Sequence, residues 1–112
     1  MSDASGPPGA SVSRDLPTIG DVLLDLYAVL EQRQRDLPED SYTAKLLMGP
    51  QDKLLKKIAE EASEVIMAAR DRDAQQTRYE IADLVYHLLV VMVREGISLD
   101  SLADELAGRR RK

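Results

Sequence analysis

Four acidic side chains in the middle of the chain have the spacing of a cation-binding site. Glu61 and Glu64 are three residues apart, and so are Glu80 and Asp83. On a helix, a spacing of three places two side chains about 60° apart, so each pair shares a face. Counted from Arg72, Glu64 and Glu80 are both 8 residues away, and Glu61 and Asp83 are both 11. In an antiparallel hairpin of two helices, the four carboxylates would therefore lie together between the helices.

A cluster of this kind can hold a hard divalent cation against phosphate oxygens. Desolvating several like charges costs several kcal/mol per ion, and an ion pair of Lys57 with Glu61 contributes only about 0.2–0.5 kcal/mol. Oxygen-only ligands in a chain without cysteine favour Mg²⁺. The spacing alone leaves open the alternative that the acids form a solvated or ion-paired helix surface.

The only histidine argues against a di-iron centre. Such bundles need a Glu-x-x-His pair on two helices, whereas His87 lies four residues after Asp83 and seven after Glu80. We expect His87 to be a hydrogen-bonded core residue. Nucleophilic catalysis is not indicated either, because the chain has no cysteine, no evident Ser-His pairing and no Gly-rich phosphate loop.

Two long helices are predicted to position the acids. The first helix is expected to begin with Pro50 and to run to about Arg70. The second helix is expected to be capped by Asp73 and to end at Gly96. Residues 84–93 are apolar on nearly every side, so the second helix should be central. Glu61 is expected at the edge of the apolar stripe of the first helix, which consists of Leu54, Ile58, Ala62, Val65 and Ala69.

Three shorter helices complete the predicted fold. Cap residues and apolar periodicity place them at about residues 18–37, 42–48 and 99–107. No stretch alternates with period two, so no strand is expected. The fold class is therefore all-α, an antiparallel helix bundle of about four to five helices. The residues expected to begin or end the shorter helices are Thr18, Asp40 or Ser41, Gly49-Pro50, Ser98 and Gly108.

Length and composition bound the domain organisation. The 112 residues suffice for one domain. Residues 1–17 are rich in Ser, Gly, Pro and Ala and are expected to form a disordered leader. The all-α domain is expected over residues 18–108, followed by a basic tail over residues 109–112.

Composition and charge also restrict location and partners. The absence of cysteine suits a reducing compartment. The longest apolar run, residues 88–93, is too short to span a bilayer, and the amino terminus lacks the apolar centre of a signal peptide. A cytoplasmic location without a membrane partner is expected. The net charge of -5 argues against nucleic acid as the main partner.

The sequence around the acids resembles a known family. Glu60-Glu61-x-x-Glu64 followed by Glu80-x-x-Asp83 resembles the metal site of the all-α nucleoside triphosphate pyrophosphohydrolases of the MazG type. Within that group, about residues 19–107 resemble the phosphoribosyl-ATP pyrophosphohydrolases of histidine biosynthesis. The segments that carry this resemblance are SYTAKLL (41–47), DKLLKKIAEEASEVIMAA (52–69), YEIADLVYHLLVVM (79–92) and GISLDSLADEL (96–106).

The resemblance implies Mg²⁺-dependent hydrolysis of the α–β phosphoanhydride of phosphoribosyl-ATP to phosphoribosyl-AMP and pyrophosphate. It assigns metal-ligand roles to Glu61, Glu64, Glu80 and Asp83, and an outer role, such as orienting water, to Glu60. Metal ions lower the pKa of bound water, so the reaction needs no protein nucleophile. Glu64 is our candidate for the general base.

The resemblance also implies substrate contacts and a homodimer. Basic residues must bind the phosphates that the metal does not neutralise. The main candidates are Lys45, Lys53, Lys56 and Lys57, and Arg33 and Arg35 are weaker candidates. Tyr42 could stack on the base or simply pack. Many relatives are fused to a cyclohydrolase whose metal site uses Cys and His, which this chain could not supply, so a stand-alone enzyme is expected.

Two alternative functions stay open at this point. One is a house-cleaning hydrolase of the same superfamily that acts on dUTP or damaged nucleotides, which the acids alone cannot distinguish. The other is a non-catalytic helical dimerisation module whose acids are surface groups.

Overall fold

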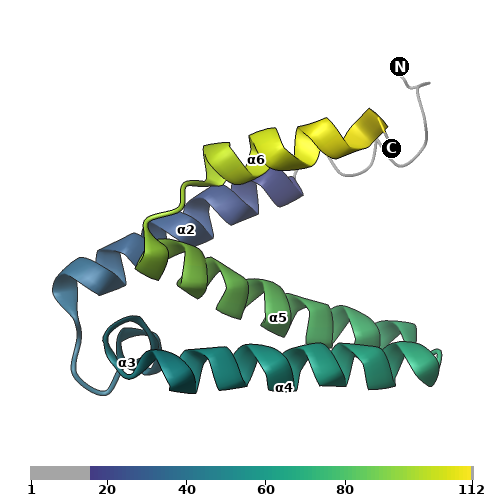
Figure 1. Cartoon of the computed structure of the whole chain (residues 1–112), viewed down its shortest axis with the longest axis horizontal. Helices are drawn as coiled ribbons and strands as arrows, with labels where there is room; N and C mark the ends of the chain where they lie inside the picture. Colours follow the sequence, from purple (N-terminus) through teal and green to yellow (C-terminus); the bar gives the residue numbers. More distant parts are fainter. Residues whose placement is uncertain (1–15, 112) are drawn as a thin grey trace.

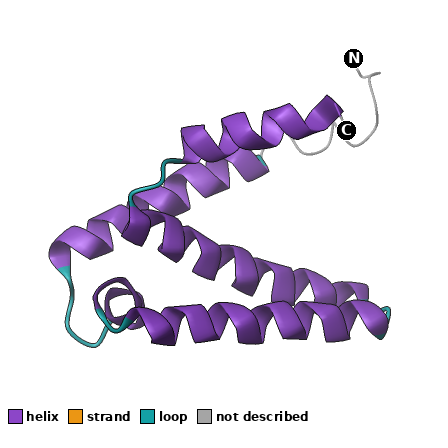
Figure 2. Cartoon of the chain, viewed as in Figure 1, coloured by secondary structure: helices purple, strands orange, loops and turns teal. Residues whose placement is uncertain are grey.

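The computed structural model describes residues 16–111, and this part of the chain is helical and contains no strand (Figure 2). The prediction of an all-α fold is confirmed. The predicted leader lies outside the described residues, apart from Leu16 and Pro17, which are exposed. None of the helices over residues 16–111 has the length and apolar character that a membrane span requires. The helices are α2 (Ile19–Asp36), α3 (Tyr42–Met48), α4 (Gln51–Arg70), α5 (Ala74–Glu95), α6 (Leu99–Gly108) and the 3-10 helix η1 (Arg109–Arg111).

Local side-chain caps begin four of the helices, as the sequence predicts. The Thr18 hydroxyl accepts a hydrogen bond from the Asp21 amide at 3.1 Å, and the side chains of Ser41, Asp73 and Ser98 accept equivalent bonds. Each cap satisfies a backbone donor that would otherwise have no partner in the first turn. Gly96 ends α5 with a φ of 72°, a conformation that glycine adopts at low cost.

The long helices α4 and α5 form a hairpin that opens away from its turn (Figure 1). The helix α3 lies at the open end of the hairpin and packs against both helices, while α2 packs on α3 and α5. The helix α6 lies beside α2 in the second arm of the molecule (Figure 1). Because α5 contacts α2, α3 and α4, it is the central helix, as predicted.

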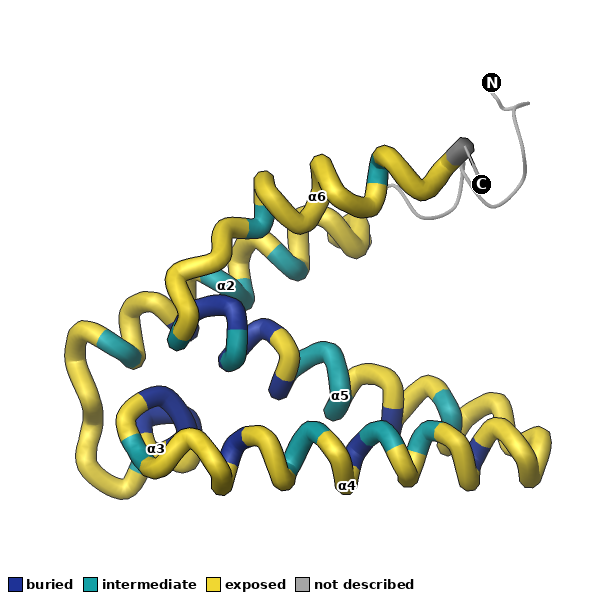
Figure 3. The backbone as a smooth tube through the Cα atoms, viewed as in Figure 1, coloured by how far each residue is buried: buried dark blue, intermediate teal, exposed yellow. Residues whose placement is uncertain are grey.

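The core lies where α2, α3 and the carboxyl-terminal half of α5 meet, and Figure 3 shows the buried segments gathered there. Two polar contacts connect these elements: the Tyr27 hydroxyl donates to the Ile97 carbonyl at 2.6 Å, and Arg94 donates to the Leu46 carbonyl at 2.8 Å. The buried apolar side chains of this cluster are Leu30, Leu46, Leu47, Leu54, Leu89, Val90, Met92 and Val93.

The buried face of α4 is rotated relative to the predicted apolar stripe. Its buried residues are Leu54, Glu61 and Ala68, spaced by seven, whereas Ala69 is exposed. Glu61 is therefore in the middle of the face that meets α5, and its placement at the edge of the stripe was wrong. Pro50 also differs from expectation, because it is the N-cap of α4 rather than its first helical residue.

Replacing Gly49 by alanine is expected to destabilise the fold by about 1–3 kcal/mol, the usual cost of overpacking. Gly49 follows α3 and donates to the Lys45 carbonyl at 2.7 Å, and an added Cβ would lie 2.5 Å from that oxygen. Urea unfolding measures the change. Gly108→Ala is the matched control, because a Cβ there meets no atom within 4 Å. Equal stability of the two variants would show that the backbone at Gly49 is free to move.

Candidate metal centre

Three carboxylates from the two helices of the hairpin lie together. Glu61 and Glu64 of α4 and Glu80 of α5 each offer one oxygen, and these oxygens lie within 4.8 Å of one another. Glu61 and Glu80 are buried, 2% and 8% exposed, whereas Glu64 is exposed. The structure thus brings three of the four predicted acids together, and we call these three the carboxylate cluster.

The two buried members of the carboxylate cluster each have an oxygen without a partner. Glu61 Oε1 and Glu80 Oε1 are buried and make no hydrogen bond. The second oxygen of Glu61 lies 3.3 Å from Lys57 Nζ, and the second oxygen of Glu80 accepts from Gln76 at 2.7 Å. Leaving a buried acceptor unpaired costs about 1–3 kcal/mol, and more when it is charged. Carboxylate oxygens of this kind, with one exposed member, fit a hard divalent cation that keeps some of its waters.

The negative charges of its neighbours affect the pKa of Glu64, the exposed member of the carboxylate cluster. The negative charge of Glu61, followed by that of Glu80, raises the pKa of Glu64 above its usual value. The ionised form of Glu64 is disfavoured because it adds a third negative charge at one place. A divalent cation would remove this penalty for all three acids.

Asp83 lies outside the carboxylate cluster, although it is on the next turn of α5 after Glu80. Its side chain is half-buried, and its negative charge helps to raise the pKa of Tyr42. Equal distance along the chain from the turn therefore does not place Asp83 in the group of oxygens that lie within 4.8 Å of one another.

His87 fixes the side chain of Tyr42 beside the cluster. The backbone carbonyl of Asp83 can only accept, so Nδ1 of His87 donates to it at 2.7 Å. In the neutral ring, Nε2 then accepts from the Tyr42 hydroxyl at 2.9 Å. Burial raises the pKa of Tyr42, the positive charge of Lys57 lowers it, and the negative charge of Glu61 raises it.

These contacts confirm that His87 is a buried, hydrogen-bonded core residue. Tyr86 packs edge-on against it, with ring centroids 5.4 Å apart, and the Tyr86 hydroxyl bonds to Thr43. The hydrogen bond between Tyr42 and His87 was not predicted from the sequence, because it joins residues 45 positions apart and no local sequence pattern indicates it.

Three of the four predicted lysines share one groove. Lys53, Lys56 and Lys57 line a groove of about 310 Å³ together with Tyr42, Leu46 and Glu60, and we call it the lysine groove. Lys45 is exposed and lines a neighbouring hollow of about 490 Å³, to which Lys53 also contributes. Glu60 is exposed and faces the lysine groove rather than the carboxylate cluster.

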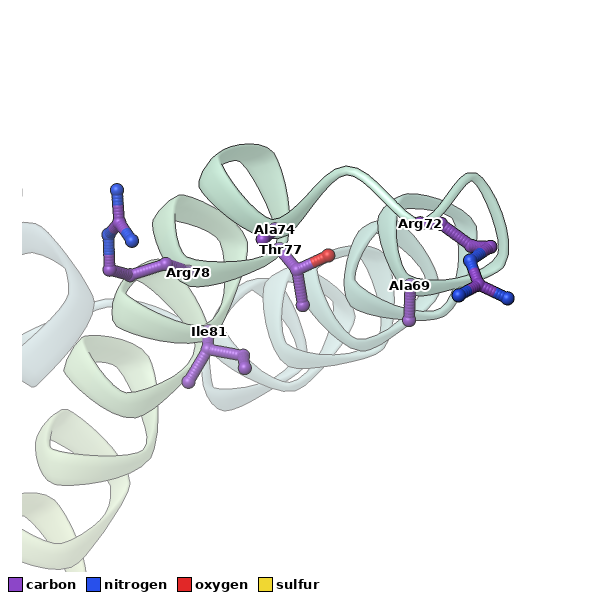
Figure 4. Close-up of a pocket in the computed structure, with 6 residues that line it drawn as sticks. All are labelled: Ala69, Arg72, Ala74, Thr77, Arg78 and Ile81. Atoms are coloured by element: carbon purple, nitrogen blue, oxygen red, sulfur yellow. The ribbon is translucent and has the colours of Figure 1, made fainter.

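A separate hollow of about 570 Å³ lies near the turn of the hairpin. Arg72 and Arg78 border it, and their guanidinium groups point away from each other (Figure 4). The other side chains along it are Ala69, Ala74, Thr77 and Ile81. It contains neither a carboxylate nor converging cations, so it belongs to the exposed surface rather than to the candidate site.

The fold and the site define an all-α protein with a candidate cation centre beside a cationic groove. Residues 23–110 match the family described as phosphoribosyl-ATP pyrophosphohydrolase, and the chain belongs to that family. The resemblance inferred from the sequence segments is thereby confirmed.

Three relatives illustrate the similarity. A phosphoribosyl-ATP pyrophosphatase of Leptospira biflexa is 51% identical over 87 residues, which are 78% of this chain and 95% of the relative. The protein of the same name from Haloarcula marismortui is 46% identical over 93 residues, 81% of this chain and 95% of the relative. The histidine biosynthesis bifunctional protein HisIE of Bacillus subtilis is 44% identical over 88 residues, 79% of this chain but only 42% of that protein.

Proposed function

We propose that the chain hydrolyses phosphoribosyl-ATP to phosphoribosyl-AMP and pyrophosphate with the help of Mg²⁺, as a step of histidine biosynthesis. The observation that carries this proposal is the pair of buried, unpartnered oxygens of Glu61 and Glu80 on facing helices, in a chain of this family. Among the ion pairs of residues 16–111, Lys57 pairs with Glu61, whereas the contact of Glu80 is a hydrogen bond from the uncharged side chain of Gln76.

In this proposal Glu61, Glu64 and Glu80 would hold the metal, with Asp83, on the next turn of α5, as the fourth acid of the site. When bound, the metal neutralises phosphate charge and lowers the pKa of a bound water. Glu64 is the member of the carboxylate cluster that solvent reaches, so it is the candidate for the general base that takes the proton of an attacking water. Glu60, exposed beside Lys57, would orient water at the edge of the site.

The lysine groove would receive the phosphates. Lys53, Lys56 and Lys57 supply three positive charges next to the acids, and Lys45 extends this surface into the neighbouring hollow. Tyr42 is 49% exposed and lines the same groove, so its ring can offer a face to the base or the ribose of the substrate.

We further propose that two copies of the chain form a homodimer. The radius of gyration is 16.9 Å, against about 13 Å for a compact domain of 100 residues. Large apolar side chains on the outer faces of α4 and α5 remain exposed, among them Leu55, Ile66, Ile81 and Leu88. A second copy is the partner that would cover such faces in a family of small enzymes. A cytoplasmic location completes the proposal, since a chain without cysteine suits a reducing compartment.

The test is pyrophosphate release from phosphoribosyl-ATP and from dUTP, each measured with Mg²⁺ and with a chelator. We expect Mg²⁺-dependent release from phosphoribosyl-ATP and none from dUTP. Release from dUTP alone would keep the metal chemistry and replace the substrate. No release from either nucleotide would favour the non-catalytic dimerisation module.

A further inference from the structure

Within residues 16–111, Lys57 belongs both to the surroundings of the carboxylate cluster and to the lysine groove. Its ammonium lies 3.3 Å from Glu61 Oε2 and 4.0 Å from Glu60 Oε1. Its side chain is 38% exposed, so it is not locked in place, whereas the side chain of Glu61 is 3% exposed. Lys57 also lines the lysine groove, together with Lys53 and Lys56.

Lys57 is the cation that lies next to the buried carboxylate of Glu61. A buried carboxylate needs a cation nearby, because leaving it uncompensated is strongly destabilising. Lys57 supplies that cation while no metal is bound, and its hydrogen bond to Glu61 raises the pKa of the ammonium. A divalent cation at the carboxylate cluster would compete for the same carboxylate and repel the ammonium at this distance.

We propose that Lys57 couples metal binding to phosphate binding: it neutralises Glu61 when the metal is absent, and it turns to a phosphate in the lysine groove when a divalent cation takes over Glu61. This inference rests on the metal site of the proposed function. Binding of the metal and binding of the phosphate then favour each other through one side chain, and the coupling is reciprocal.

Lys56 provides the matched comparison. It lines the same groove and is exposed, but the ion pairs in the described part of the chain do not connect it to an acid. Lys56 can therefore contribute to phosphate binding without competing with the metal.

The experiment measures Mg²⁺ affinity by calorimetry on the full chain, first without other ligands. Lys57→Gln is expected to bind Mg²⁺ about fivefold more tightly than the wild type, the upper range for a half-exposed ion pair. Lys57→Arg is expected to bind it several-fold more weakly, since a guanidinium can hold the Glu61 carboxylate through two hydrogen bonds. Lys56→Gln should match the wild type.

The second measurement titrates inorganic phosphate at saturating Mg²⁺ and in chelator. Lys57→Gln and Lys56→Gln should both bind phosphate more weakly with Mg²⁺ present, and only Lys57→Gln should lose part of the gain that Mg²⁺ gives the wild type. If Lys57→Gln proves unfolded in chelator, the Lys57→Arg comparison decides the question alone. A wild type that binds Mg²⁺, with unchanged affinity in both Lys57 variants, would overturn the coupling and leave the metal site standing. A wild type without Mg²⁺ binding would instead overturn the metal site.

Discussion

Glu80→Gln is expected to reduce pyrophosphate release from phosphoribosyl-ATP about a hundredfold or more, because the charge of a bound metal contributes several kcal/mol to phosphate chemistry. The fold should survive, since the amide oxygen can still accept the hydrogen bond that Gln76 donates to Glu80. In chelator the variant should be as stable as the wild type or about 1 kcal/mol more stable, because one buried like charge has been removed.

Pyrophosphate release measures the expected loss of activity, and urea unfolding in chelator measures the stability of the same preparation. Asp25→Asn is the control, because Asp25 is an exposed carboxylate on α2, whereas the carboxylate cluster lies on α4 and α5. It should change neither quantity. Unchanged turnover of Glu80→Gln, with or without a gain in stability, would leave the cluster without a catalytic role.

Mg²⁺ at about a hundred times its dissociation constant is expected to raise the melting temperature by roughly 10–20 °C, and excess chelator should reverse the rise. The linkage relation gives about 2.7 kcal/mol at that concentration, and each kcal/mol corresponds to about 4–8 °C for a domain of this size. The metal stabilises only the folded chain, since the unfolded chain does not hold Glu61 and Glu80 together.

Melting curves of the wild type and of a Glu61→Gln, Glu80→Gln double variant test this expectation under identical salt. The double variant should show almost none of the Mg²⁺-induced shift, although it should fold in chelator. A shift of equal size in both proteins would mean that Mg²⁺ acts at other acidic surfaces of this chain.

Local chemistry explains which parts of the fold were predictable. The caps at Thr18, Ser41, Asp73 and Ser98 depend on hydrogen bonds between residues three apart, so the sequence displays them directly. The same applies to Gly96, whose left-handed backbone ends α5. Helical spacing likewise predicted that Glu61, Glu64 and Glu80 come together.

Packing between distant segments explains what sequence reasoning missed. The helix α3 lies at the open end of the hairpin and brings Tyr42 to His87, while Asp83 stays outside the carboxylate cluster. The helix α4 also has apolar residues on two adjacent stripes. Sequence alone could not decide which stripe is buried. Ala69 was therefore predicted to be in the buried stripe, whereas the structure exposes it and buries Ala68.

The tight connection between α4 and α5 has a consequence for how the site arises. Glu61 and Glu80 are 19 positions apart and are joined by a turn with Arg72 in a left-handed conformation. Closing so short a loop has a small entropic cost, and contacts at short sequence separation speed folding. The hairpin alone holds these two acids together, so we expect the site to form with this unit rather than with the completed molecule. The bifunctional relative matches this chain over 88 residues, which are 42% of that protein, so in that relative the hairpin is matched as part of a whole helical domain within a longer chain.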